Sequence, residues 1–182
     1  MSRYVGIDES NHGRENEVYV LLGSNNFEDI QEKSYKNKRR IWSDVDDAER
    51  LKELENLIKD RNLKYITIDW GIRNLLHDRE IQTIILLEAI RLFRPESIFF
   101  DGIIDSKIIK QVKRKKRGIY EIHSGAKFDT KYPIVHAADT LANRIYREVT
   151  NRKASMDDGI RDFLREHLVA PDWGKYAKKI KN

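Results

Sequence analysis

The sequence predicts an α/β fold in which a mixed sheet carries helices on both faces. Two runs rich in strand-forming residues, 4–9 and 17–23, are joined by a short turn-forming segment, as expected of an antiparallel hairpin. Beyond residue 43, segments with apolar residues at helical spacing alternate with short apolar runs of strand length. A chain that begins with consecutive strands and then alternates helices with strands is typical of a mixed sheet.

The first half of the chain is expected to add a third strand, a helix and a fourth strand. A weak strand signal lies at residues 27–34, after further turn-forming residues. Ser43 or Asp44 would cap a helix. The apolar residues of this helix share one face, and they are Leu51, Leu54, Leu57 and Ile58. Residues 63–69 then form a strand that ends in an acid, and Trp70 with the glycine after it breaks that strand.

The second half alternates between helices and strands. Residues 79–93 are strongly apolar at helical spacing, and Pro95 prevents the helix from continuing. Residues 97–101 form a short buried strand that again ends in an acid. A basic helix over residues 105–116 follows, and Asp105 is suited to cap it.

The end of the chain is expected to hold one more strand and two helices. Residues 118–123 form the strand, and a helix over residues 133–151 opens on a proline suited to the first turn. Its core stripe is Ile134, Ala138, Leu141, Ile145 and Val149. Residues 157–167 can form another helix. We expect one domain over residues 1–152, with residues 153–182 as a basic helical extension of it.

Composition narrows the class of protein. The chain has 182 residues, 40% of them hydrophobic and 36% charged, which fits one domain with a sizeable core. There is no cysteine, so disulfides, thiolate metal sites and cysteine nucleophiles are excluded. No apolar run approaches the roughly 20 residues that span a bilayer, and no leader precedes the first strand. The simplest expectation is a cytoplasmic protein without a membrane partner.

Positive charge is clustered along the chain, which carries a net charge of +5. Separated basic clusters suit a polyanion, because each phosphate that they neutralise releases counterions. The alternative is a solvated basic surface without a nucleic-acid partner. If nucleic acid binds, the expected contacts include Lys38, Arg39, Arg40, Lys113, Lys115 and Lys116.

Three of the expected strands end in acidic residues. These acids are Asp8 and Glu9 on the first of the three strands, Asp69 on the second and Asp101 on the third. In open α/β sheets, ligands bind at the carboxyl ends of the strands. Carboxylates are costly to bury unless a positive charge neutralises them, and oxygen ligands select hard cations such as Mg²⁺ or Mn²⁺. Two such ions about 4 Å apart can promote phosphoryl displacement. An acidic cleft on a basic protein is therefore consistent with a nuclease.

Two of these acids have alternative interpretations. The two-residue period of a strand sends Asp8 and Glu9 to opposite faces, so Glu9 can join Asp8 only if the strand breaks there. The turn-forming residues that follow Glu9 are compatible with such a break. The alternative is that Asp8 lies buried and Glu9 caps a turn in water. Asp69 could be a further acid of the cleft, but we expect it to cap a turn.

A further acid, Asp139, lies beside the core stripe of the last long helix. His136 stands at i−3 and Asn143 at i+4, and no Lys or Arg occupies i±3 or i±4. An acid in this place, without a basic partner on its own helix, could reach a metal. The alternative is a solvated aspartate.

Three motifs resemble those of type 2 ribonucleases H. Residues 6–9, Gly-Ile-Asp-Glu, resemble the start of that family's first motif, Gly-Ile-Asp-Glu-Ala-Gly. Residues 99–102, Phe-Phe-Asp-Gly, are similar to its apolar-apolar-Asp-Gly motif, and residues 129–143 resemble its Asp-x-x-x-Pro…Ala-Ala-Ser-Ile-Leu-Ala-Lys segment. The order and spacing agree over roughly the first 150 residues. The resemblance implies a ribonuclease-H-like mixed sheet.

The resemblance also implies a function. Asp8, Glu9, Asp101 and Asp129 would be the metal-binding acids, with two Mg²⁺ or Mn²⁺ ions as cofactors. The reaction would be hydrolysis of the RNA strand of an RNA–DNA hybrid, leaving a 3′-hydroxyl. Structured RNA and single ribonucleotides in duplex DNA are the alternative substrates.

This sequence departs from the family at two places. Residues 10–15 replace the Gly-Arg-Gly segment that recognises the ribonucleotide junction, and Arg14 is only a weak stand-in for it. Asp139 stands where the family has a small serine. A related prokaryotic group of the same superfamily opens with Asp-Glu-Ser and carries Ala-Asp-x-Leu-Ala on its last helix, as residues 8–10 and 138–142 do here. In that case Asp139 would be the fourth ligand and Asp129 a loop acid or cap.

Two rival functions stay open. The same scaffold could bind nucleic acid or a protein partner without catalysis, which the altered turn after Glu9 favours. A receiver-like phosphoacceptor domain would need a lysine at the end of a late strand, where the chain has His123, Ser124 and Gly125. Trp42 and Trp70 could stack on bases, but we expect them to anchor the core.

Overall fold

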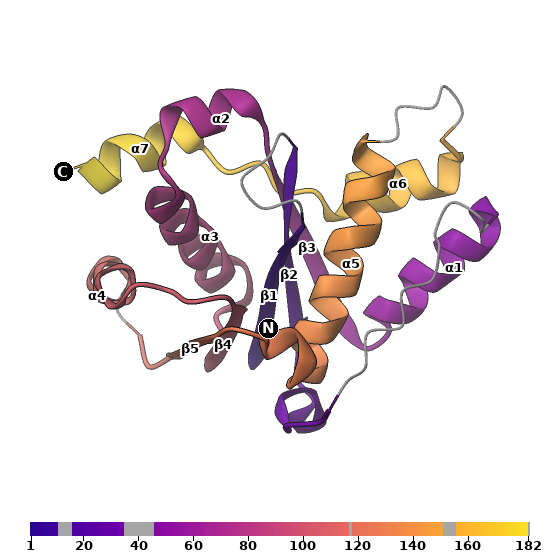
Figure 1. The fold of residues 1–182 in the computed structure, drawn as a ribbon, viewed down its shortest axis with the longest axis horizontal. Helices are drawn as coiled ribbons and strands as arrows, with labels where there is room; N and C mark the ends of the chain where they lie inside the picture. Colours follow the sequence, from indigo (N-terminus) through magenta and orange to yellow (C-terminus); the bar gives the residue numbers. More distant parts are fainter. Residues whose placement is uncertain (11–15, 35–45, 117, 151–155, 182) are drawn as a thin grey trace.

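The computed structural model describes residues 1–10, 16–34, 46–116, 118–150 and 156–181. Within them, one five-stranded sheet has the order β3-β2-β1-β4-β5 (Figure 1). The strands are β1 (Tyr4–Ser10), β2 (Glu17–Ser24), β3 (Arg61–Ile68), β4 (Ser97–Asp101) and β5 (Glu121–Gly125). β1 and β3 pair antiparallel with β2, whereas β4 pairs parallel with both β1 and β5. The mixed sheet and the opening hairpin are therefore confirmed.

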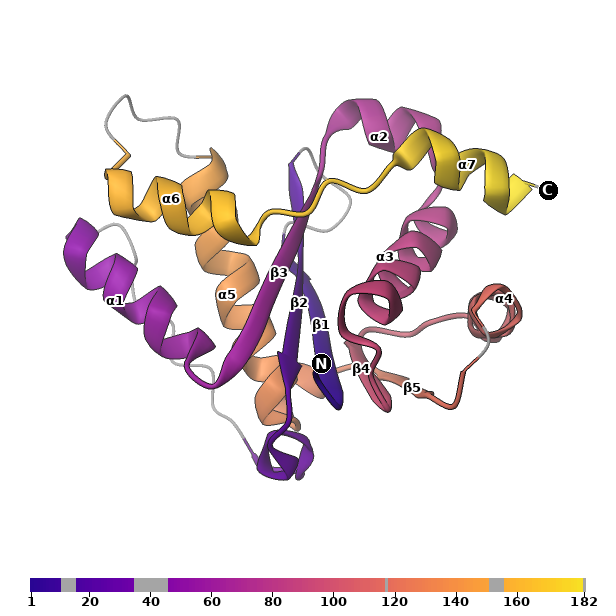
Figure 2. The same cartoon turned by 180° about the vertical axis from the view of Figure 1, so that it is seen from behind.

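Helices cover both faces of the sheet, as the sequence predicts (Figures 1 and 2). One face packs against α3 (Asp78–Phe93), α4 (Ser106–Lys115) and α7 (Trp173–Lys181). The other packs against α5 (Pro133–Thr150), α1 (Asp47–Ile58) and α6 (Asp158–His167). Two hydrophobic cores thus lie on opposite sides of one sheet. Among the described residues, no helix is long and apolar enough to cross a membrane.

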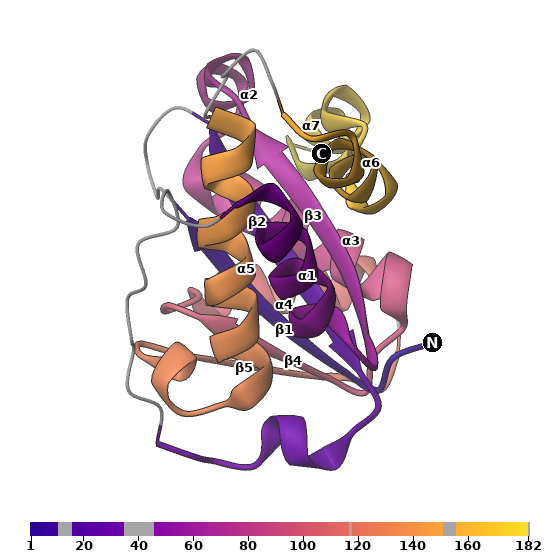
Figure 3. The ribbon, with the colours of Figure 1, turned by 90° about the vertical axis from the view of Figure 1, so that its right-hand side faces the viewer.

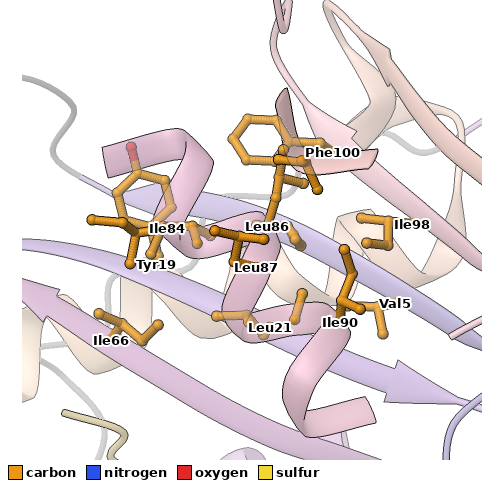
Figure 4. Close-up of a cluster of buried hydrophobic side chains, with 14 of the residues drawn as sticks. Val5, Tyr19, Leu21, Ile66, Ile84, Leu86, Leu87, Ile90, Ile98 and Phe100 are labelled. Carbon is orange, nitrogen blue, oxygen red and sulfur yellow. The ribbon is translucent and has the colours of Figure 1, made fainter. Parts of the chain in front are cut away.

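The two-residue period of the strands separates the two cores. On the α3 side, Figure 4 shows Val5, Tyr19, Leu21 and Ile98 around the apolar residues of α3. Their neighbours along the strands, among them Tyr4, Val18, Val20 and Phe99, pack on the α5 side instead. Burying a large apolar side chain of this kind contributes roughly 1.5–3 kcal/mol. Two such layers hold the sheet rigidly between the helices.

A glycine in β1 lets α5 lie close to the sheet. A Cβ atom placed on Gly6 would lie 2.7 Å from the carbonyl oxygen of Ile134, which is too close for any other residue without a shift of the helix. Gly6 lies one pleat before Asp8 on the same face of β1. The backbone contact at Gly6 therefore sets how near α5 comes to the end of β1.

The structure corrects the expected third strand. Residues Phe27–Ile30 form a short 3₁₀ helix, η1, whose first turn is capped by the side chain of Asn26. Asp29 of η1 is buried and pairs with Arg61 at the start of β3, with Nη2 and Oδ1 2.7 Å apart. The cap and this ion pair stabilise a turn where the sequence alone indicated a strand.

Two short helices were not predicted. Asp69 caps α2 (Trp70–Leu75) by accepting from the backbone N–H of Ile72, so its role as a cap is confirmed. Trp70 opens α2 and is 61% exposed, so the expectation that it anchors the core was wrong. α7 lies beyond Pro171, and Tyr176 of α7 binds the buried carboxylate of Glu88 on α3. Trp42 lies outside the described residues.

The remaining boundaries differ from expectation by a few residues. α1 begins at Asp47 with Asp46 as its cap, later than the expected start at Ser43 or Asp44. Asp105 caps α4 as predicted. Between α6 and α7 the chain runs along the outer edge of β3, where the N–H of Val169 donates to the carbonyl of Tyr65 over 2.8 Å (Figure 2). The C-terminal helices consequently pack on both faces of the sheet.

Candidate metal centre

Asp8 and Asp101 lie side by side on neighbouring parallel strands. Ile7 of β1 pairs with Phe100 of β4, so Asp8 and Asp101 are the next residues in the same register. Adjacent strands lie about 4.8 Å apart. Ile7 and Phe100 face α3, and strand alternation therefore turns both aspartates to the α5 side. The expected convergence of these strand ends is present.

Asp129 and Asp139 approach the same place from the α5 side. Asp139 lies on α5 beside the buried Ala138, and Asp129 lies in a 3₁₀ turn, η3 (Phe128–Thr130), just before that helix. The backbone N–H of Asp129 donates to Oδ1 of Asp101 over 3.3 Å. The pKa of Asp139 is raised by burial and then by the negative charges of Asp129 and Asp101. Both candidates for the fourth acid therefore belong to one cluster.

Asp8 is the most deeply placed member of this cluster. It is 5% exposed, and burial raises its pKa well above the usual range. The nearby charges of Asp101 and Asp139 raise that pKa further, while the N–H of Glu9, which donates to Oδ1 over 2.7 Å, lowers it. Burial also raises the pKa of Asp101. Negative charge in such a place needs a proton or a cation to compensate it.

Glu9 lies on the opposite face of β1. The strand does not break there, because Glu9 pairs with Tyr19 and Ser10 with Val18 in an unbroken ladder. Tyr19 belongs to the core on the α3 side, and its pKa is raised by burial and by the charge of Glu9. Of the two alternatives for Glu9, a break of the strand at this residue is therefore not realised. Glu9 still raises the pKa of Asp8, and its role as a metal ligand stays a prediction.

The donor set fits a hard divalent cation in its chemistry. The clustered side chains offer carboxylate oxygens, which Mg²⁺ and Mn²⁺ prefer, and there is no cysteine to favour a softer metal. In the described part of the chain, no three Asp, Glu, His or Cys side chains are arranged so that they could hold an ion as they stand. Binding would thus require side-chain rotations that bring the aspartates closer together.

Asn143 links the end of β1 to Asp139. Its Nδ2 donates to Oδ1 of Asp139 over 2.7 Å, and Oγ of Ser10 donates to its Oδ1 over 3.3 Å. His136, one turn earlier on α5, has Nδ1 3.2 Å from the carbonyl oxygen of Asp129 and lowers the pKa of Asp139. The helical spacing of His136 and Asn143 around Asp139 was visible in the sequence. The hydrogen bond between Ser10 and Asn143 was not visible in the sequence, because it joins residues 133 positions apart.

The basic residues expected to bind nucleic acid are only partly described. Arg14, Lys38, Arg39 and Arg40 lie outside the described residues. Lys113 is exposed on α4, and Lys115 and Lys116 are partly exposed at its end. α4 packs on the α3 side of the sheet (Figure 1), whereas Asp8 and Asp101 turn to the α5 side, where Asp129 and Asp139 lie. The structure therefore does not bring the lysines of α4 together with the acids.

The metal-free protein should become more stable as the pH falls from about 7.5 toward the ordinary aspartate pKa of about 4. The raised pKa values of Asp8, Asp101 and Asp139 mean that these groups bind protons more readily in the folded state than in the unfolded state, whereas His167, whose pKa burial lowers, has the opposite effect near its ordinary pKa of 6.5. Stability must then fall as the pH rises through the raised pKa values, and it is recovered on acidification. A gain of about 1 kcal/mol would raise the melting temperature by roughly 2–4 °C.

Melting curves in the presence of a chelator test this expectation. Acids with lowered pKa values, such as Asp29, lose their stabilising contribution only at lower pH, below their ordinary pKa of about 4. A melting temperature that depends on pH in Asp8→Asn as it does in the wild type would show that the surroundings of Asp8 do not raise its pKa, and this comparison cancels the opposing effect of His167.

Comparison with solved structures identifies the fold. Neither a scan against protein-family models nor a search of the curated proteins found a match. The structure of the PCNA:RNase HII complex from Archaeoglobus fulgidus matches with a TM-score of 0.59 at 19% identity, over 90% of this chain and 85% of that chain. Ribonuclease H2 from Pyrococcus horikoshii OT3 matches with a TM-score of 0.58 at 16% identity, over 98% and 99%.

A third solved structure agrees. Bst-RNase HIII in complex with Mn²⁺ matches with a TM-score of 0.51 at 14% identity, over 98% of this chain and 70% of that chain. At these identities the likeness concerns the fold. The chain has the ribonuclease-H-like fold that its motifs predicted.

Proposed function

We propose that the protein is a divalent-metal-dependent nuclease that hydrolyses the RNA strand of RNA–DNA hybrids. The observation that carries this proposal is the pair of aspartates in register on β1 and β4, faced by Asp129 and Asp139. Burial and mutual repulsion raise the pKa values of Asp8, Asp101 and Asp139, so cation binding would relieve a cost that the apo fold carries. The solved structures of similar fold are ribonucleases H, one of them with Mn²⁺.

In this proposal, Asp8 and Asp101 would hold the ions together with Asp129 or Asp139, and Glu9, which lies on the other face of β1, would join them only if the end of that strand changed its conformation. The chemistry that two Mg²⁺ or Mn²⁺ ions would supply when bound is stabilisation of the attacking water and of the leaving oxygen. Asn143 holds the carboxylate of Asp139 in one orientation through its amide N–H. His136 lies between Asp129 and Asp139 in the sequence and contacts the carbonyl oxygen of Asp129 through Nδ1.

A cleavage panel tests the proposal. The protein is incubated with Mg²⁺ or Mn²⁺ and an RNA–DNA hybrid, duplex RNA, duplex DNA, or duplex DNA that contains single ribonucleotides. We expect cleavage of the RNA strand of the hybrid, with a 3′-hydroxyl end. Asp129→Asn and Asp139→Asn are assayed in parallel, and the substitution that stops the reaction identifies the fourth acid. No cleavage of any of these substrates by the wild type would refute the nuclease.

The second candidate is a non-catalytic module that binds nucleic acid or a protein partner. Two observations favour it: the absence of a family-like Gly-Arg-Gly after Glu9, and side chains that would have to rotate before an ion could bind. This candidate expects salt-dependent binding of duplexes in Mn²⁺ without any cleavage.

A further inference from the structure

A pocket opens at Thr130, the residue that follows Asp129, between two segments that are far apart in the sequence. It has a volume of about 370 Å³. That is room for roughly a dozen waters at ~30 Å³ each, and thus for a phosphodiester group with part of its sugar. Its lining is polar and consists of Glu32, Lys33, Ser34, Thr130 and Lys131.

Direct hydrogen bonds hold the two sides of this pocket together. The backbone N–H of Lys33 donates to the carbonyl of Lys131 over 2.7 Å. The hydroxyl of Tyr132 donates to Oε1 of Glu32 over 3.0 Å. Figure 3 shows the segment after η1 passing below the loop that leads into α5. The pocket is therefore built by a tertiary contact between the end of η1 and the residues around η3.

The charges of the lining favour an anion. Two lysines oppose one glutamate, and Ser34 adds a hydroxyl that can donate. The hydroxyl of Thr130 already donates to the carbonyl of Lys127 over 2.8 Å. Glu32 is the one unfavourable group of the lining, and its carboxylate accepts the hydrogen bond from Tyr132. An ammonium is a point charge suited to phosphate oxygens.

The pocket adjoins the candidate metal centre through the chain itself. Thr130 and Lys131 follow Asp129 directly, and the N–H of Asp129 binds the carboxylate of Asp101. A strand of nucleic acid that reaches the four aspartates is repelled by them until cations bind. Lysines that hold a neighbouring phosphate would offset that repulsion, and the lysines of α4 lie on the other side of the sheet.

We propose that this pocket is a phosphate subsite for the backbone of the nucleic-acid strand, with Lys33 and Lys131 as its cationic ligands. The inference rests on the proposed function, because it assumes a strand that passes the aspartates. It places the contacts with the nucleic-acid backbone on the α5 side of the sheet. The subsite carries no base specificity, since phosphate contacts position a strand without reading its sequence.

Binding without cleavage tests the subsite. A fluorescent RNA–DNA hybrid is titrated with the protein in a chelator at several salt concentrations. Lys33→Gln and Lys131→Gln should each lower the magnitude of the slope of the log of the association constant against log salt, together by about 1, since the two lysines share one phosphate. Glu32→Gln should tighten binding, because it removes the negative charge among the described residues of the lining. Lys127→Gln, on the same loop but outside the pocket, should bind as the wild type does.

The outcomes separate the subsite from the catalytic proposal. Wild-type slopes in both pocket variants would overturn the subsite, even if the protein cleaves hybrids. Reduced slopes in a protein that cleaves nothing would support the subsite and refute the nuclease. A melting temperature raised by millimolar inorganic phosphate in the wild type but not in Lys131→Gln, together with wild-type binding of the hybrid by Lys131→Gln, would identify a free phosphate as the ligand and overturn the strand assignment. Absence of any hybrid binding by the wild type both in the chelator and in Ca²⁺, another hard cation that oxygen ligands bind, would overturn it as well.

Discussion

Asp101→Asn should abolish metal-dependent cleavage while the fold stays intact. The amide has nearly the shape of the carboxylate, and its oxygen can still accept the N–H of Asp129. The substitution removes one negative charge from the place where β1 and β4 end together. We expect the rate to fall by roughly two to three orders of magnitude, the scale seen when one electrostatic contact to a transition state is lost. Single-turnover cleavage of a hybrid in Mg²⁺ and in Mn²⁺ measures it.

Asp69→Asn is the matched control for this variant. Asp69 also follows a strand of the same sheet, but it caps α2, and asparagine caps a helix as well as aspartate does. This control should keep wild-type activity and a wild-type melting temperature. Full activity in Asp101→Asn would remove Asp101 from the metal site. An equal loss in both variants would point to a general electrostatic effect at this edge of the sheet.

Local sequence signals predicted most of the fold. The alternating runs of β1 and β2, the apolar helix before Pro95 and the Asp105 cap of α4 each depend on residues close together in the chain. The errors occur where contacts between residues far apart in the sequence determine the local structure. η1 replaces a strand because Asp29 pairs with Arg61, 32 positions away. α7 is held on α3 by the hydrogen bond between Tyr176 and Glu88, for which no local pattern exists.

In the candidate site too, local sequence signals predicted some features and contacts between distant residues determined the others. Acids at strand ends identified Asp8 and Asp101, because the rule about carboxyl ends of parallel strands needs no detailed geometry. For Asp139, helical spacing left solvent and metal as alternatives, and only the close approach of α5 at Gly6 places it in the field of the other acids. Strand alternation already indicated that Glu9 faces away from Asp8. The pocket at Lys33 and Lys131 joins segments about 100 residues apart, so the sequence held no signal for it.

Asp8→Asn should make the metal-free protein more stable, although it removes a residue from the proposed active site. Asp8 is 5% exposed, and its pKa is raised by burial and by Asp101 and Asp139. The amide removes a buried charge that lacks a cation, and its oxygen can still accept the N–H of Glu9. We expect a gain of about 1–3 kcal/mol at pH 7, the usual cost of an uncompensated buried polar group. In a chain of this length, each kcal/mol shifts the melting temperature by roughly 2–4 °C.

Asp29→Asn is a control of opposite sign. Asp29 is also buried, but its pKa is lowered because Arg61 pairs with it. Its neutralisation leaves a partly buried guanidinium without its carboxylate and should destabilise the protein. The stability of both variants is measured in a chelator by thermal or urea denaturation. If one variant is more stable than the wild type and the other less stable, burial alone does not determine the sign of the change in stability. The charges around each carboxylate determine it.

Addition of Mg²⁺ or Mn²⁺ should reverse the order of stability between the wild type and Asp8→Asn. An ion at 1,000 times its dissociation constant stabilises the protein that binds it by about 4.1 kcal/mol, which exceeds the expected advantage of Asp8→Asn. The wild type should gain that increment, and Asp8→Asn should gain little, because it has lost the most buried carboxylate of the set. If both proteins gain equally, the ion binds elsewhere. If Asp8→Asn is less stable than the wild type even in a chelator, the repulsion at the end of β1 is already relieved within the protein, and the electrostatic case for a metal there fails.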